Sequence, residues 1–355
     1  MFRLIIIYLF SLEIYAFPHY FHNKGRERAG AVPRIISEDV FHRFGFFILL
    51  IMCMLLASSY PKLGGANGVI NGNVIIWYFA VPLTYLEAGL TCTPKSLYAA
   101  LSDGYLLGFV MTYMYILMPL IARVASCILT YATVNPWLLK GMEVLYCMPP
   151  PFSVSLVLSR LANADLATSV TTTLISHFGG LFISPILLYF MLGASTPPLV
   201  GVNIREMVYS TLLPFGVGMS LQASVSKLSF YTEDRTAWIP RVLLLLTAYH
   251  WFCDAVSADV SSLHAVDILL CVLIACLGQL LITGFCWILC TRWLPKNILL
   301  AAMFTSTHKS IGLGGWLLRG AYHGSAHGSA VNLPLSILPV AQLLLGSLLA
   351  SWIAP

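Results

Sequence analysis

The sequence predicts an all-α membrane protein with ten transmembrane helices, on the strength of its composition, its apolar segments and two interrupted helices. The chain has 355 residues, of which 59% are hydrophobic and only 9% are charged. Soluble globular chains carry about 25% charged residues. Most side chains must therefore face lipid or other helices, and the length suits about ten spans of roughly 20 residues with short loops.

Ten apolar segments follow one another with short connections. We expect spans at residues 43–60, 74–92, 104–124, 137–159, 166–192, 207–224, 237–256, 266–290, 297–318 and 331–353. These runs are too long and too uniform for the alternating strands of an outer-membrane barrel. Residues 43–355 are therefore expected to form one ten-span domain in the lipid bilayer, preceded by an extension of residues 1–42.

The distribution of basic residues predicts the orientation of the chain. With the N-terminus in the cytoplasm and alternating loops, the non-cytoplasmic side holds only Lys62, Arg123, Lys140, Arg205 and Arg319. A cleaved signal at the apolar residues 4–17 would invert this distribution, against the positive-inside rule. We therefore expect residues 18–42 and both termini to be cytoplasmic, with the first apolar run an interfacial stretch or an extension of the gene model.

Several function classes are disfavoured by what the chain contains. The net charge is +5 and the basic residues form no stripe, so nucleic acid is not an expected partner. The nine cysteines form no CxxC pair and no spacing with histidine that suggests a metal, so no cofactor is expected. Neither a GxSxG nor an HExxH motif is present, so the sequence does not predict an enzyme.

The fourth span is interrupted near its middle by three consecutive prolines, Pro149, Pro150 and Pro151. A proline has no N–H and disfavours helical backbone at the residue before it, so the helix must break here. Unpaired backbone at this depth is tolerated only inside the protein or beside a wet cavity. A simple proline kink is the alternative interpretation.

The ninth span carries a dense polar segment inside an apolar run. The segment consists of Thr305, Ser306, Thr307, His308, Lys309 and Ser310. An ionisable side chain in the middle of a span is costly and usually functional, although a lysine can also extend its amine to the interface. Gly312, Gly314 and Gly315 follow and allow this helix to unwind.

The two interruptions occupy corresponding places, because each lies in the fourth span of a set of five. Matching interrupted helices in two halves indicate an inverted-repeat transporter with its site at the midplane of the membrane. The sequence therefore predicts two inverted five-helix repeats around a polar site.

The fifth span adds hydroxyl groups to this predicted site. Ser169 and Thr173 are four residues apart and share a helix face. Their oxygens suit hard cations or oxyanions, but hydrogen bonds between packed helices explain such residues equally well. Glu87 and Glu143 are candidates to partner Lys309 across the core, and positions in loops or at helix ends would explain them as well.

Four short strings of the sequence resemble a known family. They are residues 135–141 (NPWLLKG), 147–151 (CMPPP), 252–254 (FCD) and 306–310 (STHKS). They resemble the sodium/bile acid cotransporter 7 group of solute carrier family 10, the bile acid:sodium symporter family. The resemblance runs from about residue 43 to the C-terminus. It implies a mobile core and a panel, with the interrupted fourth and ninth helices crossing in the core.

The resemblance also implies where an ion would bind. In sodium-coupled members, sodium is held just after the proline break, by a serine and a threonine on span five, and by an acidic residue on span nine. Ser169 and Thr173 match the pair on span five. After the break, the candidate residues are Ser153 and Ser155, of which Ser155 falls where relatives carry an asparagine.

Two departures from the family pattern bear on coupling. The resemblance puts Thr305 at the acidic sodium ligand and Lys309 at a glutamine of a second sodium site. A lost carboxylate and a gained ammonium are both wrong for binding a cation. We therefore expect no two-sodium coupling, and we hypothesise that Lys309 supplies a fixed or titratable positive charge where sodium would stand. Sodium and the proton both stay open as coupling ions.

Two functions are compatible with these features. The first is secondary active transport, such as symport, of a small anion or organic anion with ion coupling. The second is a membrane regulator of calcium influx that transports nothing and acts through a partner, the calcium-influx machinery. The resemblance further implies contributions to calcium homeostasis and secretory-pathway glycosylation, and a place in the plasma membrane, the Golgi or the endoplasmic reticulum.

Overall fold

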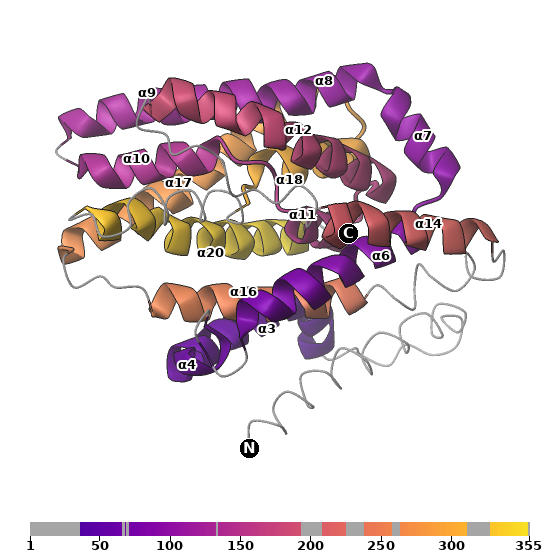
Figure 1. Ribbon diagram of the computed structural model, residues 1–355, viewed down its shortest axis with the longest axis horizontal. Coiled ribbons are helices and arrows are strands. Elements are labelled where there is room, and N and C mark those ends of the chain that lie inside the picture. The colour runs from indigo at the N-terminus through magenta and orange to yellow at the C-terminus, as the bar shows by residue number, and fades with distance from the viewer. Residues whose placement is uncertain are drawn as a thin grey trace.

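The computed structural model describes residues 36–65, 68, 71–132, 134–192, 208–224, 238–257, 263–310 and 327–353. Within these ranges the chain is helical and has no strand, as the composition predicted. Figure 1 shows the long helices stacked in layers, most of them running along the longest axis of the molecule.

The helices match the predicted apolar segments closely. Those of the first half are α3 (Ile36–Ser59), α4 (Pro61–Gly64), α5 (Gly72–Ile75), α6 (Val81–Thr91), α7 (Pro94–Ser102), α8 (Gly104–Thr112), α9 (Met118–Tyr131), α10 (Pro136–Tyr146), α11 (Phe152–Leu161) and α12 (Leu166–Leu192). Two π-helical segments, η1 (Ile76–Ala80) and η2 (Tyr113–Leu117), join α5 to α6 and α8 to α9. Those of the second half are η4 (Val208–Leu212), α14 (Leu213–Ser224), α16 (Trp238–Val256), α17 (Ala265–Cys290), α18 (Lys296–Thr307) and α20 (Gly328–Ile353).

Two differences from the prediction have local causes. The helix α7 was expected to be a loop, but Thr93 caps it by accepting a hydrogen bond from the amide of Ser96, and Pro94 occupies its first turn. The helix α3 begins at Ile36, inside the predicted extension, because a helix can continue beyond its apolar part. Residues 1–35 and the predicted second half of span nine, from residue 311, lie outside the described residues.

Within the described ranges, three helices are long and apolar enough to cross a membrane, namely Gly104–Tyr131, Ala265–Cys290 and Gly328–Ile353. The parts Leu166–Gly180 and Phe182–Met191 of α12 are bent by 55° and make a fourth if they form one span.

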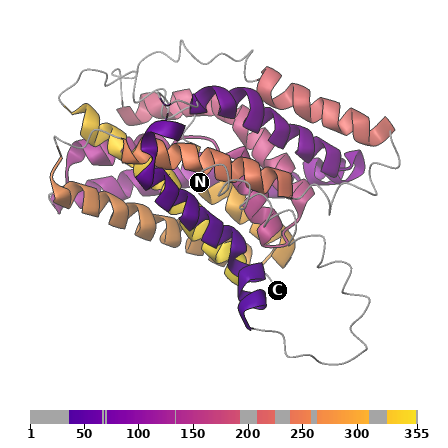
Figure 2. The ribbon, with the colours of Figure 1, turned by 90° about the horizontal axis from the view of Figure 1, so that it is seen from below.

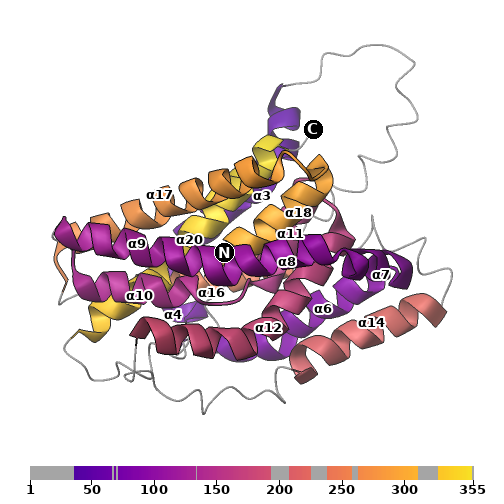
Figure 3. The ribbon, with the colours of Figure 1, turned by 90° about the horizontal axis from the view of Figure 1, so that it is seen from above.

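The helices pack as two groups. The small group contains α3, α6, α14 and α16, and the large group contains α8–α12, α17, α18 and α20. Figure 3 shows α6 beside α14 at one end of the molecule, and Figure 2 shows α3 beside α20, where the groups meet. The main apolar core lies in the large group, with Leu138, Leu145 and Phe304 almost completely buried.

Glycine allows the closest helix contact in the small group. A Cβ at Gly89 on α6 would lie 2.3 Å from the carbonyl oxygen of Phe215, and a Cβ at Gly218 on α14 would lie 2.3 Å from that of Leu86. Backbone therefore meets backbone between these two helices, as small residues permit in membrane proteins.

Candidate functional site

The structure confirms the predicted break in the fourth span, and the break is buried. The helix α10 ends at Tyr146, α11 begins at Phe152, and the three prolines lie between them in the interior. This excludes the alternative of a simple kink, since the chain leaves the helical conformation for several residues.

Two side chains of α12 satisfy carbonyl groups that the break exposes. The hydroxyl of Ser184 donates a 2.7 Å hydrogen bond to the carbonyl oxygen of Cys147. The Nδ1 atom of His177 lies 3.2 Å from the carbonyl oxygen of Pro150, to which it donates. The break is therefore held from the side by the fifth predicted span.

The polar segment of the ninth span satisfies the two carbonyls in between. The backbone amide of Ser310 donates a 2.8 Å hydrogen bond to the carbonyl of Pro149. The ammonium of Lys309 donates a 2.9 Å hydrogen bond to the carbonyl of Met148. The proline break of the fourth span therefore touches the non-helical residues 308–310 that follow α18, which is a contact that the expected crossing requires. We call this region, residues 147–151 with residues 308–310, the crossing.

Lys309 is buried in the crossing, with 3% of its surface exposed. Its Nζ atom also donates a 3.0 Å hydrogen bond to the carbonyl of Met114 and lies 5.6 Å from the ring centre of Tyr115. Both residues belong to η2, and a π-helical segment often marks a functional position. The C-terminal end of α10, which carries partial negative charge, also faces this ammonium through Met148.

Neither acidic residue proposed as a partner contacts Lys309, so that expectation was wrong. A carboxylate oxygen of Glu87 lies 2.7 Å from Nη2 of Arg160, and one of Glu143 lies 3.1 Å from Nη1 of Arg123. Both carboxylates pair with arginines on neighbouring helices, Arg160 on α11 and Arg123 on α9. Within the part of the chain that the structure describes, no carboxylate pairs with Lys309, and backbone carbonyls bind it instead.

The predicted hydroxyl groups form a buried cluster beside the crossing. Thr305 Oγ1 lies 3.1 Å from Thr173 Oγ1 and accepts a 3.2 Å hydrogen bond from Thr172 Oγ1. One turn away, Ser169 Oγ accepts from Ser159 Oγ at 3.0 Å. Thr172 was visible in the sequence as one of the hydroxyl residues of span five, but only Ser169 and Thr173 were selected as candidates because they share a helix face.

Four residues predicted for the site make only weak contacts, or contacts within their own helix. Ser155 Oγ is 3.5 Å from the carbonyl oxygen of Phe304, which is a weak contact. Ser306 and Thr307 donate to carbonyls of their own helix, at 2.6 and 2.8 Å. Ser153 is half-buried at the start of α11.

His308 and Gln342 attach the crossing to α20. The ring of His308 lies 3.1 Å from the carbonyl oxygen of Phe304 through Nδ1 and 3.2 Å from that of Gln342 through Nε2. The side chain of Gln342 is buried, and its Oε1 accepts a 3.0 Å hydrogen bond from the amide of Lys309. The sequence reasoning missed Gln342, although it is a single amide in an apolar span.

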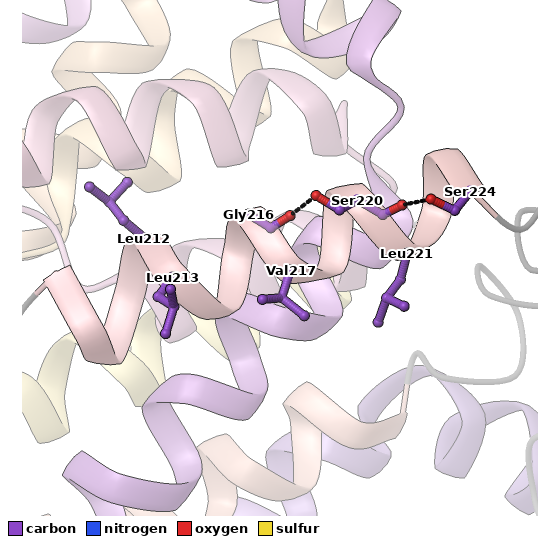
Figure 4. Close-up of a pocket in the computed structure, with 7 residues that line it drawn as sticks. All are labelled: Leu212, Leu213, Gly216, Val217, Ser220, Leu221 and Ser224. Carbon is purple, nitrogen blue, oxygen red and sulfur yellow. Dashed lines mark hydrogen bonds between the residues drawn. The ribbon is translucent and has the colours of Figure 1, made fainter.

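A surface hollow on α14 is not part of this site. It has a volume of 480 Å³ and is lined by Leu212, Leu213, Gly216, Val217, Ser220, Leu221 and Ser224. Figure 4 shows the two serine hydroxyls bonded to carbonyls of their own helix, so no polar group is aimed into the hollow.

Comparison with known proteins identifies the family. Residues 45–354 match the SBF-like CPA transporter family. The chain belongs to this family. Its members are membrane transporters of the sodium/bile acid cotransporter type, in agreement with the apolar helices and the resemblance seen in the sequence.

Several named relatives support this membership. The transporter is 27% identical over 307 residues to sodium/bile acid cotransporter 7 of Danio rerio, covering 86% of this chain and 91% of the relative. It is 28% identical to the protein of that name from Xenopus tropicalis, with 86% and 90% covered. It is also 26% identical to solute carrier RCH1 of Candida albicans, with 59% and 56% covered.

Proposed function

We propose that this transporter moves a small anion or organic anion by secondary active transport, through ten spans arranged as two inverted five-helix repeats. Both termini are cytoplasmic in this proposal. The contact between the two helix breaks supports the repeat arrangement, because it brings together the fourth span of each half. The charge distribution of the loops supports the orientation.

One observation carries the proposal, namely the position of the Lys309 ammonium. It is bound by carbonyls of η2 and of the proline break, and such carbonyls are the groups that coordinate free cations in other transporters and channels. The lysine therefore acts as a cation that is covalently attached to the protein. Thr305 stands on the same helix where the resemblance places an acidic ligand, so no carboxylate is present there to attract sodium.

A fixed positive charge determines the sign of the cargo. A second cation next to a buried ammonium would be repelled strongly, because the interior screens charges weakly. An anion would instead neutralise the lysine and reduce the cost of its burial. Sodium or a proton remains the proposed coupling ion of this transport.

Uptake into liposomes tests this proposal. The purified transporter would be reconstituted, and uptake of labelled organic anions would be measured under imposed sodium or proton gradients. We expect saturable uptake that Lys309→Gln abolishes and that Lys296→Gln, at an exposed position, leaves intact. Uptake that is unchanged in Lys309→Gln would contradict the role of the lysine. Absence of any anion uptake by the unmodified protein would contradict transport itself.

A regulator of calcium influx that transports nothing is a second candidate, and one observation favours it. Four consecutive carbonyls of the break, from Cys147 to Pro150, already have partners within the chain. A crossing that is complete without a ligand could serve as a rigid scaffold. This candidate carries with it the calcium homeostasis and glycosylation roles, and the calcium-influx machinery as partner. Absence of anion uptake combined with altered calcium influx in cells lacking the protein would favour it.

A further inference from the structure

Gln342 has one buried polar atom without a partner. Only 2% of this residue is exposed, and its Nε2 atom forms no hydrogen bond with any residue that the structure describes. Buried donors are almost always paired, and an unpaired one loses the hydrogen bonds it would make in water. Other buried polar atoms of the described residues also lack partners, but Gln342 belongs to the side chain that bonds the amide of Lys309. Its free donor is therefore placed where an acceptor on a ligand could satisfy it.

The orientation of this amide is fixed by its neighbour. The N–H of Lys309 needs an acceptor, and Gln342 Oε1 provides it at 3.0 Å. Exchanging the oxygen and nitrogen positions would place two donors against each other. The NH₂ group must therefore point away from the Lys309 amide, and its two hydrogens remain available for an acceptor.

The surroundings select an anionic acceptor over a neutral one. The Lys309 ammonium is buried and pairs with no carboxylate in the described parts of the chain. It has three hydrogens, and the two carbonyls use two of them. A donor-rich region with one uncompensated positive charge suits an acceptor that carries one negative charge.

We propose that Gln342 is a ligand-binding residue whose NH₂ group receives a carboxylate oxygen of a singly charged organic anion. This inference rests on the proposed function, because it specifies the class of anion that the crossing binds. One negative charge balances Lys309, whereas a dianion would leave the buried region with excess negative charge. A planar carboxylate also offers a second oxygen that can accept from another donor.

The substitution Gln342→Glu separates this role from a structural one. Glutamate keeps an oxygen to accept from the Lys309 amide, so we expect the apparent melting temperature to be maintained. It replaces the NH₂ donors with an acceptor that repels a carboxylate. We therefore expect binding of carboxylates to weaken about tenfold or more.

The experiment measures binding rather than transport. Thermal unfolding of the purified full-length protein in detergent would be followed with potassium acetate, potassium benzoate, potassium sulfate and neutral acetamide, since a ligand of the folded state raises its stability. We expect stabilisation by acetate and benzoate but not by acetamide, and its loss in Gln342→Glu. The matched control is Gln279→Glu on α17, another buried glutamine, whose donor Nε2 bonds Thr283 and whose unpaired atom is the acceptor Oε1.

Four results would overturn the inference. Equal stabilisation by carboxylates in Gln342→Glu and in the unmodified protein would show that the amide does not bind them. Stabilisation by sulfate alone or by acetamide would exclude the proposed class, and absence of any response in the unmodified protein would exclude the site. If Gln342→Glu does not fold, Gln342→Met serves instead, and retained carboxylate binding in that variant would also contradict the inference.

These outcomes are independent of the uptake experiment. Carboxylate binding that is insensitive to Gln342 would leave anion transport standing and remove only this residue from the site. Carboxylate binding that requires Gln342, together with absent uptake, would keep the ligand site and contradict transport.

Discussion

The backbone amide of Ser310 is bonded to the carbonyl oxygen of Pro149 at 2.8 Å, and this bond joins the proline break to the non-helical residues that follow α18. Each break on its own would leave polar backbone groups unpaired inside a membrane. Here Ser310 and Lys309 satisfy the carbonyls of Pro149 and Met148, while side chains of α12 satisfy the two carbonyls on either side. The stability of the site and its charge therefore depend on the same few contacts.

The packing of α20 against the crossing can be tested at Gly346. A Cβ at this position would lie 2.6 Å from Nε2 of His308 and 2.7 Å from Cδ1 of Leu158. The substitution Gly346→Ala should displace the imidazole and destabilise the protein by about 1–3 kcal/mol, measured as a lower melting temperature in detergent. The control is Gly284→Ala, where nothing lies within 4 Å of the added atom, and no decrease is expected there. Equal behaviour of the two variants would contradict the described packing.

The contact between α6 and α14 should be equally sensitive to added volume. Gly89→Ala and Gly218→Ala each place a methyl group against a backbone carbonyl, which cannot rotate away. Each should lower the melting temperature, and the double variant should cost less than the sum, because the first change already separates the helices. Gly216→Ala, on the open face of α14, serves as control. If the loss of stability in the double variant equalled the sum of the two single losses, the two glycines would not share one contact.

The ion pair between Glu87 and Arg160 links the two helix groups through α6 and α11. Only 3% and 11% of these side chains are exposed. Glu87→Gln should destabilise the protein by about 3–5 kcal/mol, since it leaves a buried arginine uncompensated, and adding Arg160→Gln should restore much of the loss. Glu143→Gln is the comparison, because its partner Arg123 is 53% exposed and the loss should be about 0–1 kcal/mol. Similar melting temperatures for Glu87→Gln and Glu143→Gln would contradict the expectation that the more deeply buried ion pair contributes more stability.

The hydroxyl cluster should show coupling between helices α12 and α18. In a double-mutant cycle with Thr305→Val and Thr173→Val, we expect an interaction energy of about 1 kcal/mol from the hydrogen bond between their hydroxyls. Thr247→Val provides the control, because the hydroxyl of Thr247 bonds only to its own helix at 2.8 Å. Thermal unfolding of the four cycle members gives the energy, and a value near zero would show that this contact contributes nothing.

Much of the site was predictable because its residues break local rules. Three consecutive prolines cannot continue a helix, and a lysine among apolar residues has to find polar partners. Helix positions were predictable for the same kind of reason, since long apolar runs in a membrane protein must satisfy their backbone within a helix. The exception at α7 arose because a short capped helix has no long apolar run.

The partners of the charged residues were not predictable in the same way. The sequence offered Glu87 and Glu143 to Lys309, but each carboxylate is held by an arginine, and two backbone carbonyls bind the lysine instead. Every residue carries a carbonyl, so the sequence gives no sign of which one a distant ammonium will reach. Gln342 was missed for a related reason, because a single amide in a span is usually a packing contact.

By itself, the sequence determined that the chain is a helical membrane protein, that the fourth span is interrupted, and that a positive charge lies in the polar segment of the ninth predicted span. These features follow from local chemistry, namely hydrophobicity, the missing N–H of proline and the cost of a charge in an apolar segment. Only the tertiary structure decided that Ser310 bonds the proline break at Pro149 and that Lys309 is bound by the carbonyls of Met114 and Met148. Those contacts depend on how distant helices pack, and helix packing is decided by the whole set of surfaces that must be buried together.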